Sequence, residues 1–158
     1  MDKATRQAAV AGEIDATIEA IGSALNNLDG PHGVRYRSAA RDFYCAAFHM
    51  ASALLADRSL TARSHDATQQ MLATHFVRAG ALPADTARRY NQLMERRHTA
   101  DYKPSVPVDA TDIAEFRDWL CDFIQACAAL LVHRPPRKAH AALSGLLDAL
   151  RSLRLDGG

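Results

Sequence analysis

Apolar residues recur every three or four positions along most of this chain, and glycine or proline interrupts the pattern between segments. The first stripe covers residues 10–28 and stops at Gly30, and the second covers residues 36–55. This spacing places the apolar side chains on one face of an α-helix. The two stripes therefore predict two long amphipathic helices near the N-terminus.

Shorter patterns of the same kind follow. A third segment, residues 71–77, ends at Gly80, and Pro83 should lie in the first turn of a fourth helix. Glycine after a helix and proline in its first turn are common stop and start signals. Because proline restricts the residue before it, the Pro104 loop should end the fourth helix near Tyr102.

The last two stripes cover residues 113–131, after an Asp109 or Thr111 cap, and residues 139–153. No segment alternates with period two for long enough to predict a strand. The sequence therefore predicts an all-α fold, an antiparallel helical bundle of five to six helices. We expect residues 1–134 to form the bundle and residues 135–158 to add a C-terminal helix and tail packed on the same domain.

Composition limits the partners of such a bundle. The chain has 158 residues, with 19 basic and 18 acidic side chains, so bulk charge gives no strong grip on nucleic acid. No apolar run approaches the roughly 20 residues of a membrane span, and the N-terminal segment is amphipathic, unlike a signal peptide. We expect a cytoplasmic protein without membrane contact. The three cysteines, Cys45, Cys121 and Cys127, are interpreted as reduced core thiols.

One polar cluster should lie where the fourth helix ends. Arg97 and Asp101 are four residues apart, which predicts an intrahelical ion pair. A second interpretation has Arg97 bind a phosphate, Asp101 orient it or a neighbouring histidine, and Tyr102 line the pocket. His98 is then a candidate base, and Arg96 should point further out.

Another polar flank lies on the second helix, where Arg41, Cys45, His49 and Ser52 share one side. It is a solvated edge, or Arg41 is paired with a carboxylate, or the flank is a surface shared with a second subunit. His65, where a loop enters the third helix, either bonds nearby backbone or acts as a base.

Readable signatures of other chemistry do not occur. The chain has no HExxH spacing, Gly-rich phosphate loop, nucleophile elbow or Cys/His zinc module. We therefore expect no metal and no cofactor.

Four segments together resemble a known family. In order, they are Arg41–His49 with Leu54-Leu55, the loop ending Ser64-His65, His75–Gly80, and Arg97–Tyr102. From about Arg41 to Leu131 the chain resembles the HEPN superfamily of small helical domains. It is similar to a toxin–antitoxin related prokaryotic branch in which Asp-Tyr follows the arginine, as in Arg97-x3-Asp101-Tyr102.

The resemblance implies an antiparallel bundle that forms a homodimer, with the arginine motifs of both subunits at a cleft. Many members cut RNA without a metal, using arginine on the phosphate and a following histidine to help the ribose 2′-hydroxyl attack. Such members are commonly encoded beside a minimal nucleotidyltransferase antitoxin. Besides the motif residues, we expect five others at the substrate or dimer cleft: Arg41, Tyr44, His49, His65 and Arg96.

This chain departs from the cleaving pattern at one position. Asp101 stands where the histidine is expected, and an aspartate with a pKa near 4 is a poor base at neutral pH. His98, His49 or His65 would have to replace the missing base.

Two functions therefore remain as expectations, beside a purely structural helical protein. The first is a HEPN-type component of a toxin–antitoxin or defence system that acts on RNA as a metal-independent endoribonuclease. The second is a non-catalytic HEPN module that binds a nucleotide, an RNA or a nucleotidyltransferase partner. With such a partner, Tyr102 would be a target for nucleotidyl transfer.

Overall fold

The computed structural model describes residues 2–155, and Met1 and residues 156–158 of the expected tail lie outside this range. Within residues 2–155 it contains helices and no strands, so the prediction of an all-α fold is confirmed. The elements are α1 (Lys3–Asp29), α2 (Tyr36–Asp57), α3 (His65–Leu72), the π-helical turn η1 (Ala73–Val77), α4 (Thr86–Tyr102), α5 (Ala110–Leu130) and α6 (Arg137–Ser152).

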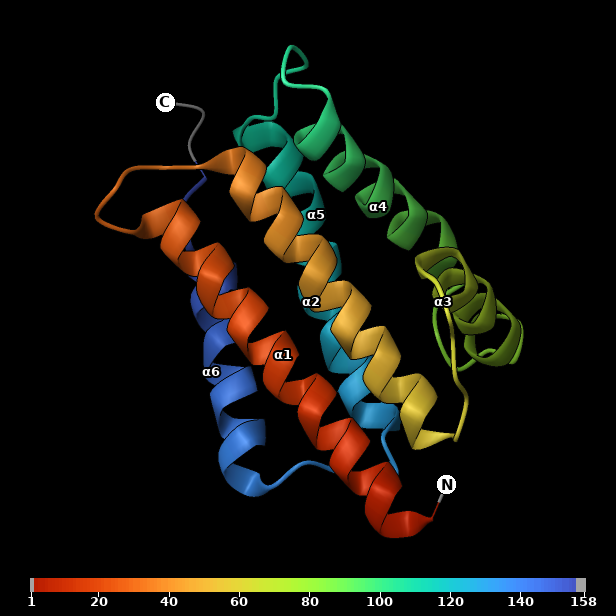
Figure 1. Ribbon diagram of the computed structural model, residues 1–158. Helices are drawn as coiled ribbons and strands as arrows, with labels where there is room; N and C mark the ends of the chain where they lie inside the picture. The colour runs from red at the N-terminus through yellow and green to blue at the C-terminus, as the bar shows by residue number, and fades with distance from the viewer. Residues whose placement is uncertain (1, 156–158) are drawn as a thin grey trace.

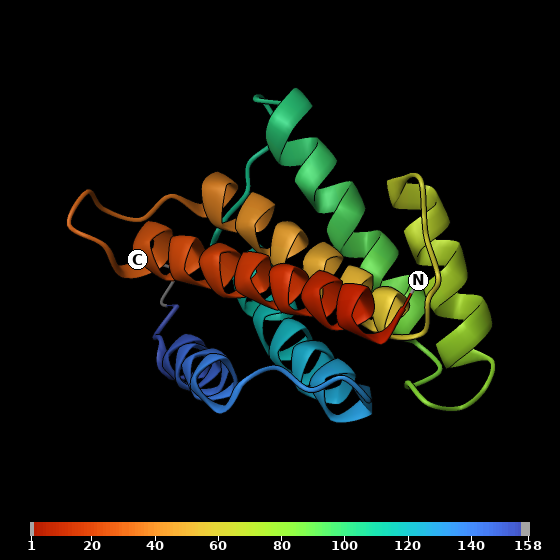
Figure 2. The same ribbon diagram turned by 60° about the horizontal axis from the view of Figure 1, so that its bottom comes forward.

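Helix α2 occupies the centre of the bundle. It lies antiparallel beside α1, and it also packs against α4 and α5 (Figure 1). Figure 2 shows α5 and α6 on one side of the α1–α2 pair and α4 on the other. Many of the buried residues of α2 are alanines, which let neighbouring helices approach closely: Ala39, Ala40, Ala46, Ala47, Ala51 and Ala53.

The helix boundaries follow local signals in the sequence. Asp109 caps α5 through a capping box, because its carboxylate accepts a bond from the Asp112 N–H while the Asp112 carboxylate accepts one from the Asp109 N–H. The expected position of Pro83 in the first turn of α4 is wrong. Pro83 instead begins a turn, closed by a 3.1 Å bond from the Thr86 N–H to its carbonyl, and the helix begins at Thr86.

Asp57, the last residue of α2, fixes the chain that leaves α5. Its buried carboxylate accepts hydrogen bonds from the Val132 N–H at 3.0 Å, the His133 N–H at 2.8 Å and the His133 Nδ1 at 2.9 Å, and it pairs with Arg58. Burial alone would raise the pKa of Asp57, but these donors outweigh it and hold the pKa below its ordinary value. The loop after α5 is thereby tied to the end of α2.

The cysteines divide into two groups. Cys121 and Cys127 are buried thiols of α5, as expected, and burial raises the pKa of Cys121 to about 11. The interpretation of Cys45 as a core thiol is wrong, because Cys45 is exposed on the polar flank of α2. Partial desolvation, with the charge of Asp42 adding to it, raises the pKa of the Cys45 thiol. It is therefore protonated at neutral pH and is a poor nucleophile.

Candidate functional site

Two arginines from different helices share one carboxylate at the α2–α4 contact. The Arg41 Nε lies 3.0 Å from the Asp101 Oδ1, and the Arg97 Nε lies 3.0 Å from the Asp101 Oδ2. The predicted intrahelical pair is therefore present, and the predicted pairing of Arg41 with a carboxylate is also confirmed. The Asp101 side chain is 16% exposed, against 48% for Arg41 and 35% for Arg97. The carboxylate is thus the least exposed member of this trio.

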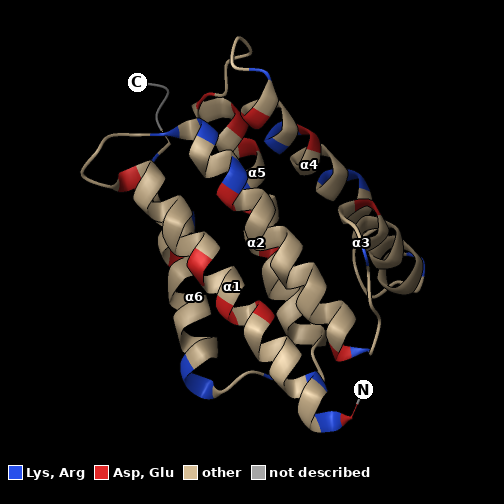
Figure 3. Ribbon diagram, viewed as in Figure 1, with Lys and Arg blue, Asp and Glu red and all other residues tan. Residues whose placement is uncertain are grey.

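The trio keeps one net positive charge, because two guanidinium groups meet one carboxylate. No other carboxylate in residues 2–155 pairs with Arg41 or Arg97. Figure 3 shows basic residues on both α2 and α4 where the two helices face each other. Guanidinium groups present N–H donors in a planar fork that matches the oxygens of phosphate, so this trio has the chemistry of an anion-binding site.

Arg37, one turn before Arg41 on α2, holds the end of α4 in place. Its guanidinium donates to the carbonyls of Ala100 at 3.2 Å, Lys103 at 3.4 Å and Pro104 at 3.0 Å, and also to that of Val106. The Ala100 carbonyl lies in the last turn of α4, where helix carbonyls lack an intrahelical partner, and the other three belong to residues just after the helix. Arg37 therefore caps α4 and sets the position of Asp101 against α2.

Tyr44 packs against Arg97 of the trio. The Arg97 guanidinium carbon lies 5.6 Å from the centre of the Tyr44 ring, a cation–π arrangement. The Tyr44 hydroxyl lies 2.5 Å from the Nδ1 of His65. Burial raises the pKa of Tyr44, and the charge of Arg97 only partly offsets this effect. The phenol is neutral at physiological pH, so it can share a proton with His65.

His65 is the first residue of α3, as expected, but the interpretation that it bonds nearby backbone is wrong. Its partner is the Tyr44 side chain, and its ring also lies 4.5 Å from the ring of Phe48. Tyr44 of α2 therefore contacts both His65 of α3 and Arg97 of α4. Tyr90 packs beside Tyr44: it is fully buried, and its ring centre is 5.9 Å from that of Tyr44.

The remaining residues of the predicted motif lie around this centre in different ways. The rings of His98 and Tyr102 are 4.9 Å apart, and Tyr102 is 66% exposed. Neither side chain contacts Asp101 through a hydrogen bond or ion pair. Asp101 therefore orients two arginines rather than a histidine.

Two predicted cleft residues have other partners. Arg96 pairs with Asp112 at 3.1 Å and so ties α4 to the start of α5. The expectation that Arg96 points further out than Arg97 is wrong, since their side chains are 33% and 35% exposed. The His49 Nδ1 lies 2.8 Å from the Glu13 carboxylate of α1, within hydrogen-bond distance.

Sequence reasoning missed Arg37 and Glu13. Arg37 is adjacent to the expected second helix start and carries no motif, and its acceptors lie more than sixty positions away. Its spacing of four from Arg41 was the one available signal, because residues four apart share a helix face.

No helix in residues 2–155 has the length and apolar content to cross a membrane.

The chain is similar to a UPF0332 protein of Thermotoga maritima, with 29% identity over 86 residues. The aligned region covers 54% of this chain and 63% of that protein, so it spans less than two thirds of the relative's length. No protein-family model and no solved structure matches the chain. The chain therefore has a distant homologue among UPF0332 proteins.

Proposed function

We propose that this chain is a HEPN-type module of a toxin–antitoxin or defence system, and that it binds RNA or nucleotide phosphate at Arg41 and Arg97. The single observation that carries the proposal is that the Asp101 carboxylate bridges the two guanidinium groups. The bridge fixes both arginines in adjacent positions. Both arginines bind Asp101 through Nε, and within residues 2–155 their other guanidinium N–H groups make no hydrogen bond or ion pair.

Physical chemistry favours a phosphate over a carboxylate-bearing side chain at this position. A phosphate offers several oxygens, and two guanidinium forks can bind them at the same time. Since Asp101 is held by both arginines, little side-chain ordering remains to oppose binding. The chain is nearly neutral as a whole, so such a contact must come from a local cluster of this kind.

Binding is the function that the geometry supports best, and cleavage is the second candidate. The observation that favours cleavage is the position of His98. It directly follows Arg97 in the chain, and its ring packs against the exposed ring of Tyr102. In this second candidate, Arg97 stabilises the phosphate and His98 helps the ribose 2′-hydroxyl to attack without a metal. His65 is engaged by Tyr44 and would need to break that bond to serve as the base.

We extend the proposal to a homodimer and to a nucleotidyltransferase partner. Tyr102 and Val106 are exposed apolar side chains that follow Asp101 closely in the chain, and a second copy would cover them. An exposed phenol at this position is also accessible to nucleotidyl transfer. Mass spectrometry after co-expression with a nucleotidyltransferase tests this role, and an unmodified Tyr102 would count against it.

The main experiment measures binding of a labelled single-stranded RNA by fluorescence anisotropy in EDTA, with gel analysis of the same samples. We expect Arg97→Ala to weaken binding about tenfold or more, because a charge-assisted hydrogen bond contributes about 1.5–3 kcal/mol. Arg78→Ala is the matched control, since Arg78 is exposed and its side chain has no hydrogen bond or ion pair in residues 2–155. It should bind like the wild type.

The gel separates the two candidates. Intact RNA with wild type and variants supports a binding module, whereas fragments that disappear in both Arg97→Ala and His98→Ala support cleavage. Equal affinity of wild type and Arg97→Ala, with no fragments in either, would reject both.

A further inference from the structure

A cavity of about 680 Å³ opens between α5 and α6, on the opposite side of the α1–α2 pair from α4. Its size is within the usual range of small-ligand sites. The residues that line it come from α1, α5, α6 and the loop between the last two: Ile14, Gln125, Ala128, Ala129, Arg134, Pro135, Arg137, His140, Leu143, Ser144 and Leu147. It shares no residue with the trio of Arg41, Arg97 and Asp101.

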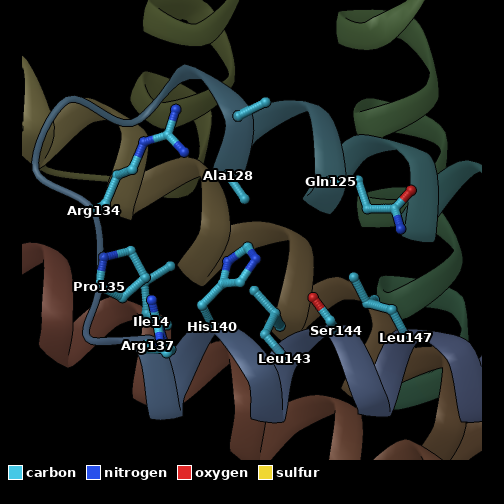
Figure 4. Close-up of a pocket in the computed structure, with 11 residues that line it drawn as sticks. Ile14, Gln125, Ala128, Arg134, Pro135, Arg137, His140, Leu143, Ser144 and Leu147 are labelled. Carbon is cyan, nitrogen blue, oxygen red and sulfur yellow. The ribbon is translucent and has the colours of Figure 1, made fainter.

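One part of the cavity is apolar. Ile14, Leu143 and Leu147 are buried and form its floor, and Ala128 and Pro135 add to its walls. Figure 4 shows His140 and Ser144 projecting from α6 toward Ala128 and Gln125 of α5. An apolar floor with a few polar groups around it is typical of a small-molecule site.

The other part is cationic. Arg134, Arg137 and His140 line one end of the cavity, and no Asp or Glu is among the described lining residues. In residues 2–155, none of these three side chains has a hydrogen bond or ion pair. Figure 3 shows basic residues at the start of α6 without acidic neighbours on that turn. This end therefore has positive charge that the chain itself leaves without a counter-ion.

The wall that carries Arg134 is held in place by other contacts. Asp57 binds the backbone of Val132 and His133, and the Arg58 guanidinium donates to the Leu130 carbonyl at 3.0 Å. The two prolines that follow Arg134 restrict the backbone further. The cavity is therefore largely formed before a ligand enters, which lowers the entropic cost of binding.

We propose that this cavity binds a small amphipathic anion, with its apolar part on the Ile14–Leu143–Leu147 floor and its carboxylate or phosphate group at Arg134, Arg137 and His140. Both features are needed for this assignment. A purely apolar ligand would leave the cations unpaired, and a bare anion would leave the floor uncovered. The proposal does not depend on RNA binding at Arg97.

The test titrates the 158-residue chain with four probes by isothermal calorimetry. The probes are octyl phosphate and octanoate, both below their critical micelle concentrations, inorganic phosphate, and octanol. We expect saturable binding of octyl phosphate or octanoate, at least tenfold tighter than inorganic phosphate and octanol. The tighter of the two amphipathic probes identifies the head group. No saturable binding of either amphipathic probe, or binding of the tighter one no better than that of inorganic phosphate or of octanol, would overturn the proposal.

Variants place the binding in the cavity. Arg134→Ala with Arg137→Ala should weaken binding at least tenfold, and Ala129→Trp should block it by filling the cavity while keeping every cation. Both changes are at exposed residues, and circular dichroism checks that each variant is folded. Arg78→Ala should bind like the wild type. Binding that survives both cavity variants, or that is lost in Arg78→Ala, would contradict the assignment.

Discussion

Asp57 and Asp101 are two aspartates near the ends of helices, and they have opposite roles. The Asp57 side chain is fully buried and accepts hydrogen bonds from two backbone N–H groups as well as from side chains. Asp101 is 16% exposed, and among residues 2–155 it pairs only with the side chains of Arg41 and Arg97. One carboxylate satisfies the backbone of a loop, and the other positions two cations at the surface.

The difference shows how to separate structural from functional charge in this bundle. Buried donors have no alternative partner when their carboxylate is removed, so its loss destabilises the fold. Half-exposed arginines can turn to water instead, so their pairing contributes little to stability. Arg41 and Arg97 can therefore bind a ligand with little cost to the stability of the fold.

The largest expected effect is at Asp57. Asp57→Ala should lower the free energy of unfolding by about 3 kcal/mol or more, because the Val132 and His133 N–H groups lose their acceptor in a buried site. Urea unfolding followed by circular dichroism measures it. Asp15→Ala, at an exposed position of α1, is the control and should change stability by less than about 0.5 kcal/mol. Equal losses of unfolding free energy in Asp57→Ala and Asp15→Ala would show that Asp57 has no special structural role.

Acid should weaken the Asp57 contribution. Because the folded pKa of Asp57 is lowered, its contribution is fully present above its unfolded pKa of about 4 and is lost as the pH falls through the folded pKa. The stability difference between wild type and Asp57→Asn should therefore shrink below about pH 4. Urea unfolding of both proteins from neutral to acidic pH tests this sign, and a difference that grows with acid would contradict it.

Arg37→Ala should have an intermediate effect. Loss of the cap on α4 should cost about 1–2 kcal/mol, because several carbonyls lose a charged donor but gain access to water. Hydrogen exchange should accelerate at the end of α4 and in the loop after it. Unchanged exchange there would show that Arg37 does not position Asp101.

Asp101→Asn should have the smallest effect on stability, below about 1 kcal/mol. The same urea measurement as for Asp57 provides the comparison. A loss as large as that of Asp57→Ala would mean that Asp101 is a structural carboxylate, and the contrast between the two would fail.

The helices could be predicted from the sequence because their signals are local. The stripe at 10–28 and the Asp109 cap each depend on residues a few positions apart, and both occur as expected. The start of α4 was misplaced because the turn at Pro83 is closed by its own backbone bond, which no apolar pattern reveals.

The sites were less predictable because they join distant segments. Arg97 with Asp101 is an i, i+4 pair that spacing predicts, but the Arg41 contact brings a different helix to the same carboxylate. The bond between Tyr44 and His65 and the clamp between Asp57 and His133 depend on packing between helices. The α5–α6 cavity likewise has no local signature.

The most direct test of the proposed function is the salt dependence of RNA binding by wild type, Arg41→Ala, Arg97→Ala and the Arg78→Ala control. If Arg41 and Arg97 contact phosphate, each of their variants should reduce the slope of log affinity against log salt by about 0.7, the value for one phosphate contact on a single strand. Arg78→Ala should keep the wild-type slope. A slope unchanged in both arginine variants, or reduced equally in the control, would contradict a phosphate site at this trio.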